Sequence, residues 1–346
     1  MPNCGSQCYL CDVPIRFDTY NGCSHACEYC FAKQFTDISK IKKNETVKQL
    51  KNFIEGKRNA ETNWCDWDIP IHWGGLSDPF QPCEKKMRLS YECLKLFVET
   101  QYPFIVSTKG KLVATEEYLS LLEKCNCVVQ VSAVCSSYDK LELGCPSYEK
   151  RLEIISKLSK RVKRVIVRIQ PYMHEVFDEV YDNLEKVKNA GAYGVIIEGM
   201  KFKKKKPGLI KIGGDFVYPY DLIMDDFLKL KSRAHQLGLK IYAGENRIRR
   251  LGDSLTCCGI DGMEGFKPNT FNLNHILNGD TSVKPTDKMR ENKTGGCFRT
   301  MYQDTVNGAV VENQSFAFNM LNEYKQKKNS VDKIMGVDMR GKTVKG

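Results

Sequence analysis

Three cysteines near the start of the chain have the spacing of a metal-cluster loop. The segment from Gly22 to Cys30 reads Gly-Cys-Ser-His-Ala-Cys-Glu-Tyr-Cys, so that Cys23, Cys27 and Cys30 follow a Cys-x3-Cys-x2-Cys pattern. Three thiolates on so short a loop can wrap one face of an iron–sulfur cubane and bind three of its four irons. The fourth iron then stays open to a chelating ligand, such as the amino and carboxylate groups of S-adenosylmethionine (SAM).

An electron delivered through such a [4Fe–4S] cluster can cleave the SAM sulfonium to methionine and a 5′-deoxyadenosyl radical. That radical abstracts hydrogen from otherwise inert carbon, while the protein positions the substrate and excludes competing reactions. The alternative for the same cysteines is a structural zinc site, which needs a fourth ligand and usually pairs two cysteine knuckles. His25 could serve as that ligand, but its position inside the loop makes tetrahedral closure awkward.

The cysteine loop resembles the signature of the radical SAM superfamily, including the aromatic Tyr29 directly before the last cysteine. In that superfamily the aromatic residue packs beside the adenine of SAM. Residues 73–84 also resemble the Ser/Thr-Asp-Pro-aromatic-Gln-Pro-x-Glu segment of the spore photoproduct lyase-like branch, with Ser77 and Asp78 in the cofactor site. The resemblance covers roughly residues 13–245. It implies a [4Fe–4S] cluster, SAM, and an external electron donor such as flavodoxin or ferredoxin.

The resemblance also assigns further SAM contacts. Gly74 and Gly75 stand where the superfamily aligns backbone carbonyls with the SAM amino group, and glycine lets the backbone approach a ligand closely. The positions that match contacts to the SAM ribose or carboxylate are Ser107, Lys109, Ser132 and Arg151. Spore photoproduct lyase carries a hydrogen-donating cysteine about where Gly75 stands in this chain. The resemblance therefore supports the mechanism better than the substrate.

Short apolar runs alternate with amphipathic stretches along most of the chain, which indicates parallel β/α architecture. The predicted strands are Val13–Tyr20, Ile69–Gly74, Phe104–Ser107, Val128–Ala133, Val165–Gln170, Val195–Glu198 and Leu239–Ala243. The predicted helices are Val47–Glu55, Lys86–Glu99, Glu116–Lys124, Tyr148–Lys160, Val176–Asn189 and Tyr220–Leu237. With the resemblance, this pattern predicts a partial (β/α)6-type TIM barrel with functional residues just beyond the carboxyl ends of its strands.

Three regions are expected along the chain. Residues 1–12 form an N-terminal cysteine-rich segment, residues 13–245 the radical SAM core, and residues 246–346 a C-terminal extension. The extension contains Asn- and Gly-rich turns and a polar helical tail, and we interpret it as an appended region rather than an independent domain.

A second cysteine triad precedes the core. Cys4, Cys8 and Cys11 repeat the Cys-x3-Cys-x2-Cys spacing, which predicts a second iron–sulfur cluster or a zinc site. A straight strand over residues 13–20 spans roughly 26 Å, so the second site is expected at the opposite end of the barrel from the first. No glycine or Ser-Asp segment accompanies it, so a second SAM site is not expected there.

Three more cysteines could belong to either site. Cys257, Cys258 or Cys297 could complete the second site, although the chain leaves residue 243 at the catalytic end and a long return would be required. Alternatively, Cys257 and Cys258 lie near the substrate, where a thiol could donate hydrogen or bind metal. Packing in a hydrophobic core is the third interpretation.

Composition and charge bear on the location of the protein, the role of its cysteines and its possible partners. The chain has 346 residues, 16 cysteines and a formal net charge of +11. It contains no apolar run of about 18 residues and no secretory signal, so a cytoplasmic protein without a membrane span is expected, where cysteines more often bind metal than form disulfides. Basic charge attracts nucleic acid without specifying it. The Lys-rich run at residues 201–206 is interpreted as a solvated loop.

Three functions agree with these observations. The leading hypothesis is a radical SAM enzyme acting on a nucleic acid or a nucleotide-like substrate. The second is a radical SAM enzyme that modifies a peptide or protein with the help of an auxiliary cluster. The third is a zinc-stabilised nucleic-acid-binding protein without catalytic activity.

Overall fold

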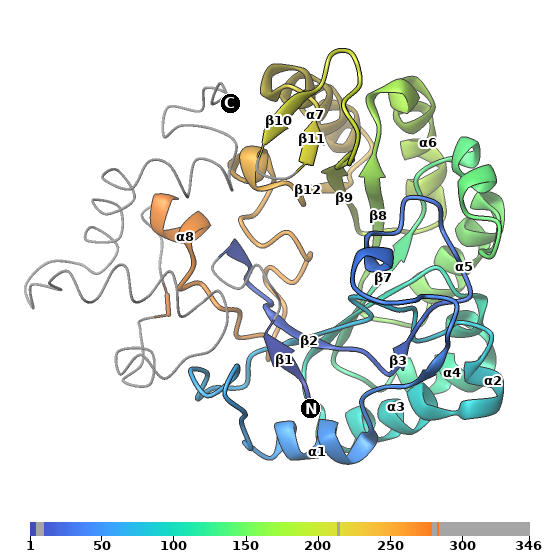
Figure 1. Ribbon diagram of the computed structural model, residues 1–346, viewed down its shortest axis with the longest axis vertical. Coiled ribbons are helices and arrows are strands. Elements are labelled where there is room, and N and C mark those ends of the chain that lie inside the picture. The colour runs from blue at the N-terminus through green and yellow to red at the C-terminus, as the bar shows by residue number, and fades with distance from the viewer. Residues whose placement is uncertain (5–9, 213–214, 279–281, 284–346) are drawn as a thin grey trace, which may run out of the picture.

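A curved parallel sheet with helices on its outer side forms the centre of the computed structural model, which describes residues 1–4, 10–212, 215–278 and 282–283 (Figure 1). In the described part, eight strands hydrogen-bond in the order β1-β2-β5-β6-β7-β8-β9-β12, and only the β1–β2 pair is antiparallel. The strands are β1 (Asn3–Cys4), β2 (Ile15–Phe17), β5 (Ile71–Trp73), β6 (Phe104–Thr108), β7 (Cys127–Ser132), β8 (Val165–Tyr172), β9 (Gly194–Gly199) and β12 (Lys240–Ala243).

The outer layer consists of the helices that connect these strands. They are α1 (Val47–Ile54), α2 (Glu84–Met87), α3 (Leu89–Thr100), α4 (Glu116–Leu122), α5 (Tyr148–Ser159), α6 (Phe177–Asn189) and α7 (Tyr220–Gln236). Side chains alternate across each strand, so Phe104 and Val106 join the large core under the helices, while Ile105 belongs to a separate cluster inside the barrel. A small hairpin, β10 (Ile210–Ile212) and β11 (Asp215–Val217), extends beyond β9.

The predicted partial TIM barrel is confirmed. Each of the seven predicted strands corresponds to one parallel strand of the sheet, and the predicted helices correspond to α1 and α3–α7. The strand and helix periodicity of the sequence therefore predicted the architecture correctly, apart from two local differences.

The first difference lies before the cysteine loop, where the predicted strand over residues 13–20 is divided. β2 ends at Phe17, and β3 (Tyr20–Asn21) pairs outside the main sheet with β4 (Lys42–Lys43). The cause is Asp18, whose carboxylate accepts hydrogen bonds from the backbone N–H groups of Leu76 at 2.9 Å and Ser77 at 3.1 Å. The chain therefore leaves the sheet at Asp18 and carries the cysteine loop outward.

The second difference is a break in the predicted helix over residues 86–99. Arg88 adopts a left-handed backbone conformation with φ of 57°, and it separates α2 from α3. The buried Glu84 carboxylate spans the break, because it accepts hydrogen bonds from the backbone N–H groups of Ser90 at 3.0 Å and Tyr91 at 2.8 Å. It also accepts from the Tyr118 hydroxyl at 2.8 Å.

The described part of the C-terminal region returns along the barrel instead of extending away from it. After the 3₁₀ helix η6 (Asn246–Leu251), the backbone N–H of Asp253 donates to the carbonyl of Ile241 in β12 at 2.9 Å. The buried Asp12 carboxylate then holds this region through Thr256 Oγ1 at 2.5 Å and His275 Nε2 at 2.9 Å. His275 belongs to the short helix α8 (Leu273–Asn278).

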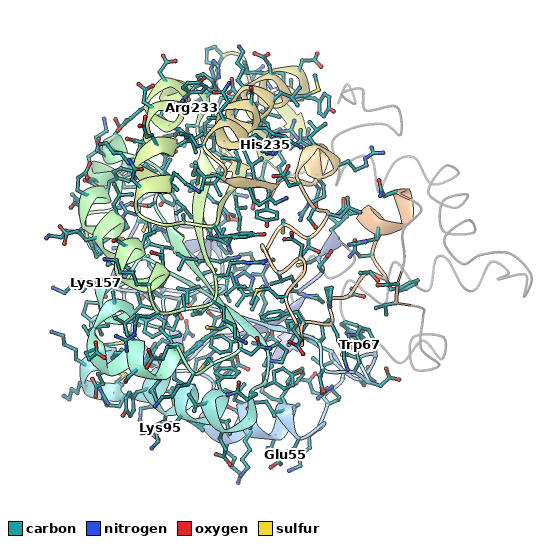
Figure 2. The ribbon with its side chains drawn as sticks, turned by 180° about the vertical axis from the view of Figure 1, so that it is seen from behind. Glu55, Trp67, Lys95, Lys157, Arg233 and His235 are labelled. Atoms are coloured by element: carbon teal, nitrogen blue, oxygen red, sulfur yellow. The ribbon has the colours of Figure 1, made fainter. Side chains whose placement is uncertain are left out.

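This returning segment fills the amino-terminal end of the barrel. Cys258, Ile260 and Phe266 pack with Ile105 and Val128, which lie near the beginnings of their strands. Trp67, which is labelled in the view from behind in Figure 2, contacts this segment as well, because its Nε1 donates to the carbonyl of Lys267 at 3.1 Å. In the described residues, no helix is both long enough and apolar enough to cross a bilayer.

Candidate active site

The loop that carries Cys23, Cys27 and Cys30 begins at the end of β3 and is turned by two left-handed residues. Gly22 has φ of 83°, and a Cβ there would lie 2.6 Å from the carbonyl oxygen of Lys40, so only glycine fits. Ala26 has φ of 50°, an uncommon conformation for alanine. These two turns return Cys27 toward the barrel after the chain has passed Cys23.

The buried carboxylate of Asp78 fastens this loop to the sheet. His25 Nε2 lies 3.0 Å from Asp78 Oδ2, and Thr108 Oγ1 donates to Asp78 Oδ1 at 2.8 Å. The backbone N–H groups of Lys109 at 2.6 Å and Gly110 at 3.1 Å donate to the same carboxylate. Burial opposes the charge, but His25 and these donors keep the pKa of Asp78 below its usual value.

His25 is held on both sides of its ring. Its Nδ1 lies 2.9 Å from the carbonyl of Gly144, so both ring nitrogens face acceptors. Burial alone would lower the pKa of His25, but Asp78 and the Gly144 carbonyl raise it overall. Asp78 and His25 therefore form a buried hydrogen-bonded pair that holds the cysteine loop.

Neighbouring residues of the same motif add further bonds to the loop. Gln81 Nε2 donates to the carbonyl of Gly22 at 3.1 Å, and Gln81 Oε1 accepts from the backbone N–H of Ser24 at 2.9 Å. Ser77 Oγ donates to the carbonyl of Tyr20 at 2.6 Å. Ser77 and Asp78 thus lie beside the cysteine loop, and their described contacts are with the protein itself.

Glu142 contacts three of the predicted SAM-site residues, and a fourth, Ser132, is linked to it through Arg151. Its buried carboxylate accepts from the Tyr29 hydroxyl, pairs with Arg151 Nη1 at 2.5 Å and lies 3.8 Å from Lys109 Nζ. Arg151 Nη1 also donates to the carbonyl of Ser132 at 3.0 Å. The structure therefore brings Tyr29, Lys109, Ser132 and Arg151 together, while their contacts with SAM stay a prediction. Glu142 itself was missed, because a lone glutamate after a strand gives no recognisable sequence signal.

Gly74, Gly75 and Ser107 lie at the ends of adjacent strands. Gly74 follows β5 with φ of 84°, and a Cβ there would lie 2.6 Å from the carbonyl oxygen of Ser107. Ser107 Oγ donates to Gln130 Oε1 at 3.0 Å and accepts from Arg168 Nη1 at 3.1 Å, so its hydroxyl faces the barrel interior. A Cβ on Gly74 would also lie 2.9 Å from Pro79 Cδ, so the packing of the protein itself requires glycine there.

A cysteine that sequence analysis missed lies against the loop. Cys145 Sγ is 3.8 Å from Cys27 Sγ. The Cys145 thiol and the nearby Lys109 cation together lower the pKa of Cys27 to about 6, although burial opposes this shift. At Cys23, burial and the Asp78 carboxylate raise the thiol pKa to about 12. Cys145 has no recognisable spacing to the other three cysteines, and only the fold brings it here.

The donor set fits an iron–sulfur cluster. Three thiols on one loop lie buried or half-buried, and the Lys109 cation near Cys27 would offset part of the negative charge of metal-bound thiolates. A coordinated metal also deprotonates a thiol outright, so the raised pKa of Cys23 does not prevent ligation. Within the described ranges, no group of three His, Cys, Asp or Glu side chains is arranged around a single metal-ion position.

Another cysteine group lies at the opposite end of the strands. The Asp12–Thr256 contact brings their chain neighbours Cys11 and Cys257 together, and Cys257 Sγ lies 3.8 Å from Cys258 Sγ. The sequence predicted a long path from residue 243 to this end of the barrel. The path is short, because the chain reverses at η6 and runs back beside β12. The alternative position of Cys257 and Cys258 near a substrate at the carboxyl ends of the strands does not agree with this location.

The environment of these thiols is charged. The Cys258 thiol and the buried Arg249 guanidinium lower the pKa of Cys257 to about 6, against the effect of burial. Burial and the neighbouring Cys257 raise the pKa of Cys11 to about 12. The backbone of Cys4 in β1 pairs with that of Ile15 in β2, whereas the Cys4 side chain, Cys8 and Cys297 lie outside the described part of the structure.

Comparisons with known proteins agree with this fold. No family model matches the chain. Uncharacterized proteins of Mycobacterium tuberculosis and Mycobacterium bovis are 26% identical over 212 residues, which cover 57% of this chain and 62% of each relative. The match thus spans less than two thirds of the relatives' length.

Two structures of spore photoproduct lyase are similar to this one. One is complexed with dinucleoside spore photoproduct, and the other is a mutant with bound AdoMet and the same dinucleoside. Both give a TM-score of 0.53 at 16% identity over 67% of this chain, covering 77% and 76% of theirs, respectively. The chain therefore has the fold of radical SAM enzymes of the spore photoproduct lyase type, which confirms the predicted resemblance at the level of the fold.

Asp18 gives a pH-dependent test of the geometry beside the cysteine loop. Burial raises its pKa to about 7, although the N–H groups of Leu76 and Ser77 oppose the shift. The folded protein therefore retains a proton that unfolded aspartate releases near pH 4, so the free energy of unfolding falls as pH rises from about 4 through about 7.

We expect Asp18→Asn to remove this decline, because the amide oxygen can accept the same two hydrogen bonds without a charge. At about pH 8 the variant should be more stable than wild type by a few kcal/mol, at about 1.4 kcal/mol per unit of pKa shift, and nearly equal at about pH 4. Thermal unfolding followed by circular dichroism measures this, with the exposed Asp66→Asn as control. Parallel pH profiles for Asp18→Asn and wild type would contradict the assignment.

Proposed function

We propose that the chain is a radical SAM enzyme that holds a [4Fe–4S] cluster through Cys23, Cys27 and Cys30. When bound, the cluster supplies the electron that cleaves SAM to methionine and a 5′-deoxyadenosyl radical, which abstracts hydrogen from the substrate. The observation that carries the proposal is the attachment of the cysteine loop to the carboxyl ends of the strands through Asp78. The fold of spore photoproduct lyase supports it.

The chain's own residues have separate tasks in this proposal. Backbone carbonyls at Gly74 and Gly75 accept from the SAM amino group, and the Tyr29 ring packs beside the adenine. Lys109, Ser107 and Ser132 contact the carboxylate or ribose.

Arg151 contributes to the same binding site. Its side chain is fully buried against Glu142, so we assign it a positioning role toward Tyr29 and Lys109 as well as charge near the SAM carboxylate. The contacts with Glu142 hold the Tyr29 and Lys109 side chains in place before SAM binds. Less side-chain entropy is therefore lost when SAM binds.

We propose a nucleic acid or nucleotide-like substrate. The formal net charge of +11 favours a polyanionic partner. Inside the barrel, burial and the cations Arg168 and Arg16 lower the pKa of His72, so this side chain does not add to the positive charge of the two arginines. An anionic substrate group would offset these charges. One similar spore photoproduct lyase structure holds a dinucleoside, which supports the same substrate class.

Two other functions remain as alternatives with distinct metal contents. A peptide- or protein-modifying radical SAM enzyme would use an auxiliary cluster at the second cysteine group. A zinc-stabilised nucleic-acid-binding protein would contain zinc and no iron, and anaerobic preparations would be colourless rather than brown.

Replacing one predicted ligand tests the catalytic assignment. Cys27→Ala should abolish reductive cleavage of SAM to 5′-deoxyadenosine, because two thiolates on the loop do not hold a site-differentiated cluster. The product is measured by chromatography after anaerobic incubation with SAM and dithionite. The half-buried Cys83→Ala, outside the loop, should retain cleavage. Wild-type-like cleavage by Cys27→Ala would defeat the assignment.

We further propose a second metal centre at the amino-terminal end of the barrel that includes Cys11 and Cys257. The contact between residues 12 and 256, the short sulfur–sulfur distance to Cys258 and the buried Arg249 cation support it. Arg249 would offset the charge of metal-bound thiolates, as Lys109 does at the first loop. The participation of Cys4 and Cys8 stays a prediction from their spacing.

Metal analysis tests this second centre. Reconstituted wild-type protein should contain more than about four irons per chain, or zinc beside about four irons. Cys11→Ala should lose only the excess metal and keep the iron needed for SAM cleavage, whereas the buried Cys125→Ala should lose none. About four irons and no zinc in the wild-type protein would exclude the second centre.

A further inference from the structure

The half-buried thiol of Cys145 lies against the sulfur of one predicted cluster ligand. Its Sγ is 3.8 Å from Cys27 Sγ, which is within the range of a hydrogen bond between two sulfur atoms. The same distance is too short for two thiolates that bind different irons of one cubane, so Cys145 is not a further ligand of the cluster. The contact therefore joins a cluster ligand to a protein group beside it.

The backbone around Cys145 is packed directly on the cysteine loop. His25 Nδ1 lies 2.9 Å from the carbonyl of Gly144, the residue before Cys145. A Cβ on Gly144 would lie 2.4 Å from the carbonyl oxygen of Ser24. Contacts this short do not occur for real side chains, so glycine is needed for the two backbones to approach this closely. The loop that carries Cys27 thus determines where the Cys145 thiol lies.

The chemistry of the two sulfur atoms decides the direction of their hydrogen bond. A metal-bound thiolate carries no proton, so Cys27 can only accept, whereas a cysteine thiol is a weak donor. The carboxylate of Glu142, a competing acceptor, is already engaged by the Tyr29 hydroxyl and by Arg151. A negative charge on Cys145 would lie beside the Cys27 thiolate, which repels it. The Cys145 thiol therefore keeps its proton and donates it to the Cys27 sulfur.

We propose that the Cys145 thiol donates a hydrogen bond to the Cys27 thiolate and thereby raises the reduction potential of the cluster. This inference rests on the proposed function, since it needs the cluster held by Cys23, Cys27 and Cys30. Reduction by one electron adds one negative charge to the cluster and its sulfur ligands, and a donated hydrogen bond stabilises that charge. No proton is transferred, and the hydrogen bond is present in both oxidation states. Cys145 acts through Cys27 and is a positioning residue.

Removing the donor should lower the reduction potential of the cluster. In Cys145→Ala, the ratio of reduced to oxidised clusters at a fixed potential should fall at least about threefold, which corresponds to about 28 mV for a one-electron couple. Cys145→Ser should recover the potential, at least in part, because it keeps an O–H donor. Both variants lose the volume of the sulfur atom, so the difference between them reports the hydrogen bond rather than the packing.

The experiment compares wild type, Cys145→Ala, Cys145→Ser and Cys135→Ala, all reconstituted anaerobically. Cys135 is a buried cysteine after the same strand, β7, and its replacement should leave the potential unchanged. Redox titration followed by EPR spectroscopy measures the potential of the cluster whose signal changes when SAM is added, which separates it from any second centre. Iron analysis checks that each variant carries as much iron as the wild type.

A lower potential in Cys145→Ala, with recovery in Cys145→Ser and unchanged iron content, would support the proposal. Equal potentials in all four proteins, an equally low potential in Cys145→Ser, or loss of iron from Cys145→Ala would overturn it. If the wild-type cluster responds to SAM while all potentials are equal, only the role of Cys145 fails. A wild-type protein that binds no cluster would overturn the proposed function and this inference together.

Discussion

The carboxylate of Asp78 is the point on which the arrangement of the site depends. It lies buried where β5 and β6 end, and it joins His25 of the cysteine loop to Thr108 and to the backbone of Lys109 and Gly110. A buried charge is costly unless hydrogen bonds and an opposite charge satisfy it, and here five groups do so, including the backbone N–H of Phe80. Loss of this carboxylate would leave the loop without its attachment to the strands.

A second buried carboxylate arranges the neighbouring half of the site. Glu142 holds Tyr29, Lys109 and Arg151, which come from the cysteine loop, the end of β6 and α5. Its chain segment also positions Cys145 beside Cys27. The two carboxylates thus have different roles. Asp78 fixes the position of the cysteine loop, and Glu142 fixes the side chains that face the proposed SAM position. Positive charge from Lys109 remains beside the sulfur atoms and favours thiolates.

The sequence predicted the barrel and the loop because both depend on local patterns. Strand and helix periodicity predicted the parallel sheet, and the spacing of Cys23, Cys27 and Cys30 indicated a candidate site, whose loop the structure attaches to the carboxyl ends of the strands. Glu142 and Cys145 were missed since their roles arise only from long-range packing. Asp18 ended a predicted strand early through bonds to residues almost 60 positions away, as the separation of 59 from Ser77 shows. The contact of the C-terminal segment with Asp12 could not be predicted from local spacing either, because it joins residues far apart in the sequence.

The central claim is that three thiolates on one loop hold an iron–sulfur cluster with one iron open to SAM. Pulsed EPR of the reduced protein with SAM labelled isotopically at its amino nitrogen and carboxylate tests it most directly. Hyperfine coupling from both labelled groups to the cluster is expected, and it should be lost when Cys27 is replaced. A cluster signal without coupling to either label, or a protein that contains only zinc, would contradict the account.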